Sequence, residues 1–229
     1  MTWREEAKRR AALEAVKHVE DGFIVGLGSG STAAYVIKEI GRRMLQEGLQ
    51  VLGVPSSSQA MMLALQSGIP LTSLDENPVL DLDIDGADQI DKQLNLIKGG
   101  GGALTREKIV ASASKQFVVV ADETKLVEKL GTDYRVPVEV LPFALAPATA
   151  AIKKLDGKPV LRESKGKVGA VVTDNGNYIV DVDFGPITDA EELNRRIKLI
   201  PGVIETGLFV RMADLVYLGK TDGVTKLEK

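Results

Sequence analysis

Short apolar segments alternate with stretches of helical periodicity over the first half of the chain, and this alternation limits the possible folds more than any other feature. FVVVAD, residues 117–122, is an almost continuous apolar run, which is typical of a strand buried on both faces of a parallel sheet. Helical periodicity extends over residues 4–20 and 31–46, and an apolar segment follows each stretch. This order predicts an open α/β domain with right-handed crossovers, whose ligands bind beyond the carboxyl ends of the strands.

The pattern changes after residue 131. PVEVLPF, KPVLRE, YIVDVDF and VIETGLF are strand-like, whereas PATAAIKKLDG and TDAEELNRRIKLIPG are helix-like. We expect Thr188 to be the N-cap of the second helix, with Glu191 completing a capping box. The resulting order, βαββαβ, is the ferredoxin-like arrangement. ADLVYLGK, residues 213–220, is expected to form one more strand that returns to the first domain.

These segments predict two domains, residues 1–131 with 210–229 and residues 132–209. The formal net charge is −3, so there is no overall electrostatic case for nucleic-acid binding. The chain has no Cys, which excludes disulfides and fits a reducing compartment. Its one His, His18, lies on the first predicted helix and is interpreted as structural. No segment approaches the ~20 apolar residues of a membrane span, so we expect a soluble, cytoplasmic protein.

The segment GLGSGST, residues 26–32, joins a predicted strand to a predicted helix. Its glycines allow a tight turn, and backbone N–H groups with the Ser31 and Thr32 hydroxyls suit an anion at a helix N-terminus. It is not a Walker loop, and its glycine spacing does not fit the dinucleotide fingerprint. A plain N-capped turn has the same composition, so anion binding is a hypothesis here.

The segment LDLDIDGAD, residues 80–88, places Asp81, Asp83 and Asp85 on one face of a predicted strand. Such carboxylates are either solvated or satisfied by backbone N–H groups, because unpaired burial is costly. Asp85 and Asp88 flank Gly86 at the carboxyl end of the strand, where side chains reach the ligand region. Substrate hydroxyls and Mg²⁺ are both suitable ligands for them, although the spacing does not match an EF-hand.

The segment KGGGGALTREK, residues 98–108, contains four consecutive glycines, Gly99–Gly102, which allow the backbone to approach a small ligand closely. Lys98 precedes them, Thr105 is a candidate N-cap, and Glu107 falls in the first helical turn. A glutamate there also has a simpler explanation, since it complements the helix dipole by ~0.3–1 kcal/mol. Lys125, after the fourth strand, is either a surface lysine or a ligand contact.

Together, these segments closely resemble the A-type ribose-5-phosphate isomerase family. GLGSGST, GVPSSSQA, DIDGADQID, KGGGGALTREK and VVVADETK occur in the order and spacing of that family, along nearly the whole chain. The resemblance implies a Rossmann-like domain that carries a ferredoxin-like α/β subdomain. It also implies interconversion of D-ribose 5-phosphate and D-ribulose 5-phosphate in the non-oxidative pentose phosphate pathway, with no metal and no organic cofactor. The family usually has DGADE where this chain has Gln89, a departure from which we expect little effect.

The same resemblance implies residue roles. Glu107 matches the family's proton acceptor, and Asp85, Asp88 and Lys98 match its other catalytic positions. Lys8 matches a position near the phosphate, more loosely. The substrate-binding residues implied by the resemblance are Ser29, Gly30, Ser31, Thr32, Asp85, Gly86, Ala87, Asp88, Lys98, Gly99, Gly100, Gly101 and Lys125.

The residue types suit this chemistry. One carboxylate can carry a proton between C2 and C1 through an enediol if it is held ~3 Å from both carbons, and Glu107 is the candidate. Lys98 and the glycine N–H groups are candidates to stabilise the charge on the substrate oxygen. Either Asp85 or Asp88 can move the proton in ring opening, and the residues leave this choice open.

Two other functions can use the same loops. A sugar-phosphate sensor binds without turnover, but such sensors usually carry a helix-turn-helix module, and this chain begins almost directly with the α/β domain. A CoA transferase uses a glutamate nucleophile, but it needs more chain to hold CoA. We therefore expect a sugar-phosphate substrate, no nucleic-acid or membrane partner, and a homo-oligomer, either a dimer or a tetramer.

Overall fold

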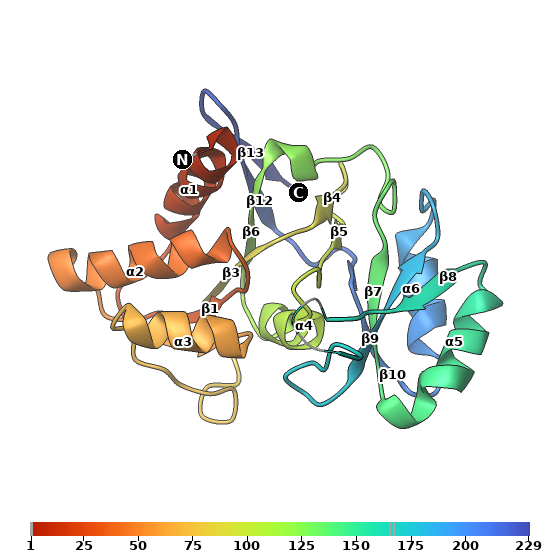
Figure 1. The fold of residues 1–229 in the computed structure, drawn as a ribbon. Helices are drawn as coiled ribbons and strands as arrows, with labels where there is room; N and C mark the ends of the chain where they lie inside the picture. The colour runs from red at the N-terminus through yellow and green to blue at the C-terminus, as the bar shows by residue number, and fades with distance from the viewer. Residues whose placement is uncertain (1, 165, 167) are drawn as a thin grey trace. The chain divides into compact units, whose positions relative to one another are not determined.

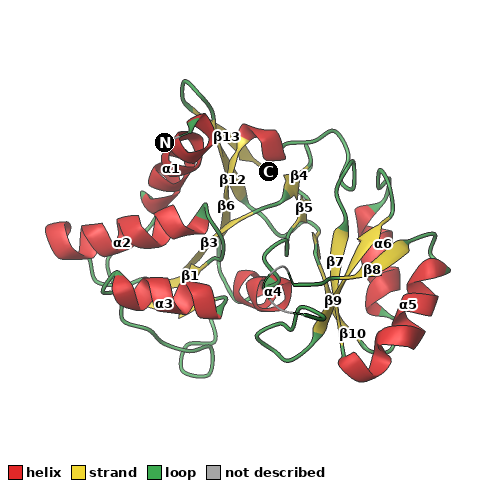
Figure 2. Ribbon diagram, viewed as in Figure 1, coloured by secondary structure: helices red, strands yellow, loops and turns green. Residues whose placement is uncertain are grey.

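The computed structural model describes residues 2–164, 166 and 168–229, and Met1 of the predicted first domain lies outside them. The chain forms two compact units (Figures 1 and 2). Unit 1 comprises Met1–Ala87, Arg106–Lys125 and Arg211–Lys229, and unit 2 comprises Asp88–Thr105 and Leu126–Val210. The compactness of these units does not test the predicted domain boundaries, which stay a prediction.

Unit 1 is built on a six-stranded sheet of order β13-β12-β6-β3-β1-β2. Its strands are β1 (Ile24–Leu27), β2 (Leu52–Pro55), β3 (Leu82–Gly86), β6 (Phe117–Asp122), β12 (Leu215–Gly219) and β13 (Val224–Glu228). Every neighbouring pair is parallel except β12 with β13. The mainly parallel sheet is confirmed, as is the return of residues 213–220 to it as β12, whereas β13 had not been predicted.

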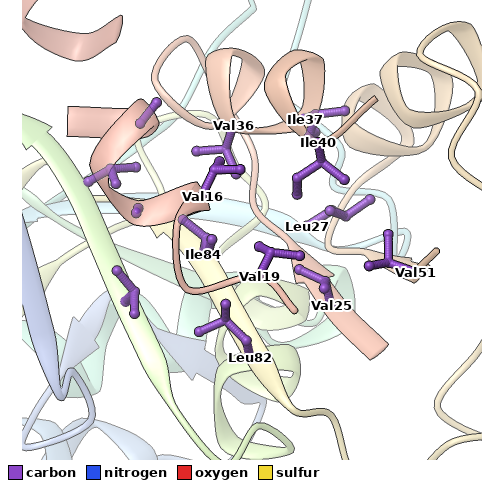
Figure 3. Close-up of a cluster of buried hydrophobic side chains, with 14 of the residues drawn as sticks. Val16, Val19, Val25, Leu27, Val36, Ile37, Ile40, Val51, Leu82 and Ile84 are labelled. Atoms are coloured by element: carbon purple, nitrogen blue, oxygen red, sulfur yellow. The ribbon is translucent and has the colours of Figure 1, made fainter. Parts of the chain in front are cut away.

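The core of unit 1 lies between this sheet and helices α1 (Trp3–Val16), α2 (Ala33–Glu47) and α3 (Ser58–Gln66). Figure 3 shows Val16, Val36 and Ile40 of the helices meeting strand residues such as Leu27 and Ile84. Burying each such aliphatic side chain contributes roughly 1.5–3 kcal/mol. The prediction that α1 continues to residue 20 was wrong. The helix ends at Val16, and a turn containing Gly22 leads into β1.

The opposite face of the sheet carries the aspartate row of β3 and one further helix, α4 (Leu104–Ser112). Val110 of α4 packs with Val54 and Leu80 in a small apolar cluster. The first two residues of α4 belong to unit 2, and the rest of the helix belongs to unit 1.

Unit 2 contains an antiparallel sheet of order β10-β7-β9-β8, which confirms the ferredoxin-like βαββαβ arrangement. Its elements are β7 (Val136–Val140), the 3₁₀ turn η2 (Pro142–Ala144), α5 (Leu145–Lys153), β8 (Lys158–Leu161), β9 (Tyr178–Asp183), α6 (Ala190–Lys198) and β10 (Val203–Thr206). The predicted cap of α6 was wrong by one residue. Asp189, not Thr188, is the N-cap, and its Oδ1 accepts a hydrogen bond from the Glu192 N–H at 2.9 Å.

Unit 2 also holds a small sheet, β11-β5-β4, that the sequence did not predict. Its strands are β4 (Gln89–Ile90), β5 (Leu96–Ile97) and β11 (Leu208–Phe209). VIETGLF is therefore not one strand, because it divides at Gly207 into β10 and β11, which belong to different sheets. A Cβ at Gly207 would lie 2.3 Å from the Lys98 carbonyl oxygen, so the chain there passes too close for any side chain. No helix in the described chain is long and apolar enough to cross a membrane.

Candidate active site

The GLGSGST loop joins β1 to α2 at the point where the strand order of unit 1 reverses. From β1 the chain continues to β2 on one side and to β3 on the other. Ligands of open α/β sheets bind at such switch points. Thr32 is the N-cap of α2 but makes no side-chain cap hydrogen bond, and the first turn carries no acidic residue. The N-terminus of α2 is therefore suited to an anion.

Two glycines of this loop lie where the structure has no room for a side chain. A Cβ at Gly26 would lie 2.6 Å from the Asp83 Oδ1, and a Cβ at Gly28 would lie 2.2 Å from the Asp85 Oδ1. Asp83 and Asp85 are each 1% exposed, so their carboxylates occupy the space that side chains on β1 would need. These two glycines therefore make room for buried carboxylates, and Gly26 also makes room for the Val110 Cγ1, 2.5 Å from the position of its Cβ.

Two backbone donors of the loop already have acceptors within unit 1. The Ser29 N–H donates to the Asp85 Oδ1 at 2.9 Å, and the Gly30 N–H donates to the Gln59 Oε1 at 2.9 Å. The Ser29 hydroxyl is itself held by Ser56 and Ser57, at 2.9 and 2.6 Å. Of the predicted loop residues, Ser31 and Thr32 at the start of α2 are the better placed to bind an anion.

Of the two predicted lysines, Lys8 contacts this loop, and Lys125 follows β6 in the same unit. Lys8 of α1 donates from Nζ to the Ser31 Oγ at 3.1 Å and to the Glu5 Oε1 at 3.0 Å. The fold thus brings Lys8 to the loop, although the sequence match there is loose. Lys125 is half-buried and ends the 3₁₀ turn η1 (Glu123–Lys125), directly after β6. Asp122 holds that turn by accepting hydrogen bonds from the backbone N–H and the hydroxyl of Thr124.

The DGAD segment is divided between the two units after Ala87. Asp85, in unit 1, accepts from the N–H groups of Ser29 and Gly86 through Oδ1, the second at 2.6 Å. Asp88, in unit 2, is half-buried and accepts from the Gly100 N–H through Oδ2 at 2.7 Å. Asp85 therefore holds the backbone at Ser29 and at Gly86, whereas Asp88 is more accessible.

The small sheet of unit 2 sets Asp88 opposite Lys98. Gln89 pairs with Ile97 in the antiparallel β4–β5 ladder, and the Asp88 N–H donates to the Ile97 carbonyl at 2.8 Å. Lys98 is 2% exposed, and its Nζ lies 5.4 Å from the centroid of the buried Phe209 ring on β11. Gln89 itself joins the Gly131 N–H and the Thr132 carbonyl, so the departure from DGADE concerns the packing of that loop.

The structure explains three of the four glycines after Lys98. Gly99 and Gly102 have φ values of +100° and +87°, which side-chain-bearing residues rarely adopt. A Cβ at Gly100 would lie 2.7 Å from both the Asp88 Oδ1 and the Tyr134 hydroxyl. A Cβ at Gly101 would meet nothing within 4 Å. Only Gly101 is without an internal reason in the structure, and it is exposed.

The glycine run is held by residues that sequence reasoning missed. Arg162 donates from Nη1 to the carbonyls of Gly99 and Gly100, at 2.9 and 3.0 Å, and it pairs with Asp181. Burial, and secondarily the Asp88 carboxylate, raises the pKa of the Tyr134 hydroxyl, which donates to Asp88. A single Arg at the end of a strand gives no pattern, and its partners are distant in sequence, so no signal could have found it.

Glu107 lies in the first turn of α4 and is 5% exposed. Two residues earlier, the Thr105 hydroxyl donates to the Oε2 of Glu139 at 2.6 Å. Glu139 is fully buried on β7, and its Oε1 accepts from Thr173, Asn175 and Asn177 at 2.8–3.0 Å. This buried carboxylate anchors the start of the helix that carries Glu107. Among the described residues, no three His, Cys, Asp or Glu side chains gather closely enough to bind a metal ion.

The fold and these loops define a class, the α/β proteins whose chain forms a Rossmann-like unit and a ferredoxin-like unit. The family model of ribose 5-phosphate isomerase A, also called phosphoriboisomerase A, matches residues 52–223, and the chain belongs to this family.

Known relatives agree with this assignment along the whole chain. A ribose-5-phosphate isomerase A from Methanosarcina acetivorans is 54% identical over 220 residues, which cover 96% of this chain and 93% of the relative. The structure of ribose 5-phosphate isomerase A from Methanocaldococcus jannaschii has a TM-score of 0.95 at 48% identity and covers 98% of this chain and 99% of its own. A D-ribose-5-phosphate isomerase in complex with phospho-erythronic acid has a TM-score of 0.97 at 44% identity, with both chains fully covered.

Proposed function

We propose that this chain interconverts D-ribose 5-phosphate and D-ribulose 5-phosphate, a step of the non-oxidative pentose phosphate pathway, and that Glu107 moves the proton. The observation that carries the proposal is a nearly buried glutamate, in the first turn of a helix that directly follows the glycine run, in a member of this family. The reaction moves one proton between neighbouring carbons of the same sugar and is redox-neutral. It therefore requires no organic cofactor.

Glu107 takes the proton from C2 of the aldose and returns it to C1, through an enediolate intermediate. General acid–base catalysis of this kind contributes about 10²–10⁴-fold to the rate. A mostly buried carboxylate suits this role, because little water competes for its proton. The anchoring of Thr105 by Glu139 limits the freedom of the first turn of α4, which keeps the base in position.

Negative charge grows on the substrate oxygen as the proton leaves. Lys98 and backbone N–H groups of the glycine run supply the donors that stabilise it, apart from the Gly100 N–H, which already donates to Asp88. The burial of Lys98 strengthens this effect, since a charge acts more strongly where water is excluded.

Ring opening requires a proton to move between the ring oxygen and the C1 hydroxyl. We assign this step to Asp88 because it is more exposed than Asp85, whose Oδ1 already accepts from the backbone N–H groups of Ser29 and Gly86. In this assignment Asp85, together with Gly86 and Ala87, shapes the binding loops by holding the backbone at Ser29 and Gly86.

The phosphate is assigned to the N-terminus of α2, with the Ser31 and Thr32 hydroxyls, Lys8 and Lys125. Ser29 and Gly30 shape this loop, because their N–H groups bond to Asp85 and Gln59. Phosphate binding orients the reacting carbons and supplies binding energy remote from the chemistry.

The test is direct conversion of ribose 5-phosphate to ribulose 5-phosphate by the purified protein in the presence of EDTA. Rapid turnover supports the proposal. Binding of the sugar phosphate without turnover would favour the sensor, and acyl-CoA exchange with a trapped glutamyl thioester would favour the CoA transferase. Neither alternative has a specific observation in its support.

We also propose that the protein works in the cytoplasm as a homo-oligomer, either a dimer or a tetramer. The absence of Cys from the sequence supports a reducing compartment. Light scattering coupled to size-exclusion chromatography tests the oligomeric state, and a monomer at micromolar concentration would contradict it.

A further inference from the structure

We propose that Arg162 is a positioning residue for the isomerisation. In this proposal, Arg162 orients two peptide groups of the glycine run so that the N–H of Gly101 donates to the substrate oxygen that becomes negatively charged. The inference rests on the proposed isomerase function and adds a residue that positions the backbone for this reaction.

Arg162 follows β8 and is held between two partners within unit 2. Its Nε donates to the Asp181 Oδ2 at 2.8 Å, and its Nη2 donates to the Asp181 Oδ1. The remaining Nη1 donates to the carbonyls of Gly99 and Gly100, at 2.9 and 3.0 Å. The two side chains are only 17% and 20% exposed, so this pair is largely withdrawn from water. One guanidinium therefore fixes the direction of two successive carbonyls.

The direction of a carbonyl determines the direction of the next N–H. In a trans peptide the C=O and the following N–H point in opposite directions across a rigid plane. The Gly99 carbonyl points to Arg162, and accordingly the Gly100 N–H points away, where the Asp88 Oδ2 accepts it at 2.7 Å. The Gly100 carbonyl also points to Arg162, so the Gly101 N–H points away from it as well.

The N–H group of Gly101 is available to a ligand. No acceptor for the Gly101 N–H is present in the described part of the chain, and Gly101 is exposed. Gly101 is also the one glycine of the run whose missing side chain has no internal explanation. Both observations are accounted for if a ligand atom approaches this backbone group.

The charge of Arg162 strengthens this donor. A cation bound to a carbonyl polarises the peptide group, and polarised groups donate more strongly in a hydrogen-bond chain. Asp181 matches the charge with a planar two-point contact, which only Arg among the cationic side chains can make. Because Asp181 neutralises its charge, Arg162 acts through the backbone and is not expected to bind a phosphate group itself.

The test compares Arg162→Met with Arg195→Met, a matched control that removes an exposed Arg–Glu pair on α6 of the same unit. For Arg162→Met we expect kcat to fall about 10- to 100-fold, somewhat less than the loss of one oxyanion donor, with KM within about threefold. Affinity for phospho-erythronic acid, whose carboxylate resembles the enediolate, should fall in parallel with kcat, while affinity for inorganic phosphate should not change. Arg195→Met should match the wild type in all four quantities.

Unchanged kcat in a folded Arg162→Met protein would overturn the proposal. An equal loss of inorganic phosphate affinity would also overturn it, because it would indicate general loosening. Asp181→Asn should add little to Arg162→Met in the double variant, since Asp181 acts only through the arginine. Additive losses would show that the two residues act separately and would contradict the arrangement.

A measurement on the wild type keeps the test valid if the variant does not fold. The ¹⁵N–¹H signal of Gly101, assigned with Gly101→Ala, should move downfield when phospho-erythronic acid saturates the protein. An unchanged signal would overturn the assignment of this donor. Absence of isomerase activity in the wild type would instead refute the proposed function, so the two failures are distinguishable.

Discussion

The two glycine-rich segments, residues 26–32 and 99–102, look alike in sequence but use glycine differently. In the first, Gly26 and Gly28 make room for Asp83 and Asp85, and the ligand groups that we propose are hydroxyls and a helix N-terminus. In the second, Asp88 and Arg162 hold the backbone by hydrogen bonds, and we propose that the backbone itself is the functional group. The number of glycines therefore does not measure how closely a ligand approaches. The first segment is expected to govern binding and the second to govern the rate.

The largest expected effect on stability comes from Glu139, which accepts a hydrogen bond from Thr105 just after the second segment. Glu139→Ala removes the common acceptor of Thr105, Thr173, Asn175 and Asn177 inside the core. We expect the free energy of unfolding to fall by about 3–5 kcal/mol, because buried donors lose their partner. Urea denaturation measures this change.

Glu139→Gln is the matched control for that variant. Its Oε1 can keep three donors, and the Thr105 hydroxyl can rotate to accept from the new amide. The expected loss is about 1 kcal/mol or less. Equal losses for the two variants would show that the network does not stabilise the fold.

A smaller loss of stability is expected when a side chain is added to the first segment. Gly28→Ala places a Cβ 2.2 Å from the Asp85 Oδ1 and 2.5 Å from the Asp85 Cα, so the backbone itself must shift. We expect a loss of about 1–3 kcal/mol. Gly101→Ala should change stability by no more than about 0.5 kcal/mol, because its Cβ meets nothing. Thermal unfolding of both variants decides whether the two segments differ in this way.

The binding role of the first segment is tested at Lys8, which donates to Ser31. Lys8→Met should raise KM about tenfold, equivalent to ~1.4 kcal/mol, with kcat nearly unchanged. Lys17→Met removes an exposed lysine from the end of the same helix and should have no effect. A fall in kcat with constant KM would contradict the division between binding and rate.

The smallest effect concerns Tyr134, whose pKa is raised by burial and by Asp88. Below the unfolded-state pKa of about 10, the tyrosine is neutral in both states and its hydrogen bond to Asp88 contributes fully. Above it, only the unfolded chain loses the proton, so stability falls as pH rises, by up to ~1.4 kcal/mol per pH unit. The stability difference between wild type and Tyr134→Phe should therefore shrink from pH 9 to 11. A stability difference that stays constant over this pH range would contradict the stabilising hydrogen bond between Tyr134 and Asp88.

Long elements were predictable because their periodicity is sustained. The parallel sheet, residues 117–122 as β6 and the βαββαβ order all followed from the sequence. The small sheet β11-β5-β4 did not, because strands of two residues have no period to detect. The cap of α6 was misplaced because Thr188 and Asp189 each have a glutamate three residues later.

The residues of the candidate site also divide into those that a local sequence pattern predicts and those that it does not. Motifs close in sequence pointed to Ser31, Asp88, Lys98 and Glu107, and their roles remain proposals. Arg162 and Glu139 were not predictable, because each acts through residues that are distant in sequence and meet it only in the folded sheet. Pairing across a sheet is a property of register, and a single sequence does not reveal it.

The central claim is that Glu107 moves the proton, and Glu107→Gln tests it most directly. We expect kcat for ribose 5-phosphate to fall by about 10²–10⁴-fold, while affinity for phospho-erythronic acid stays within a few-fold of the wild type. The amide keeps the size of the side chain and removes only its basicity. Turnover within about tenfold of the wild type would contradict the claim and move the base to another residue, with Asp88 and Asp85 the first to examine.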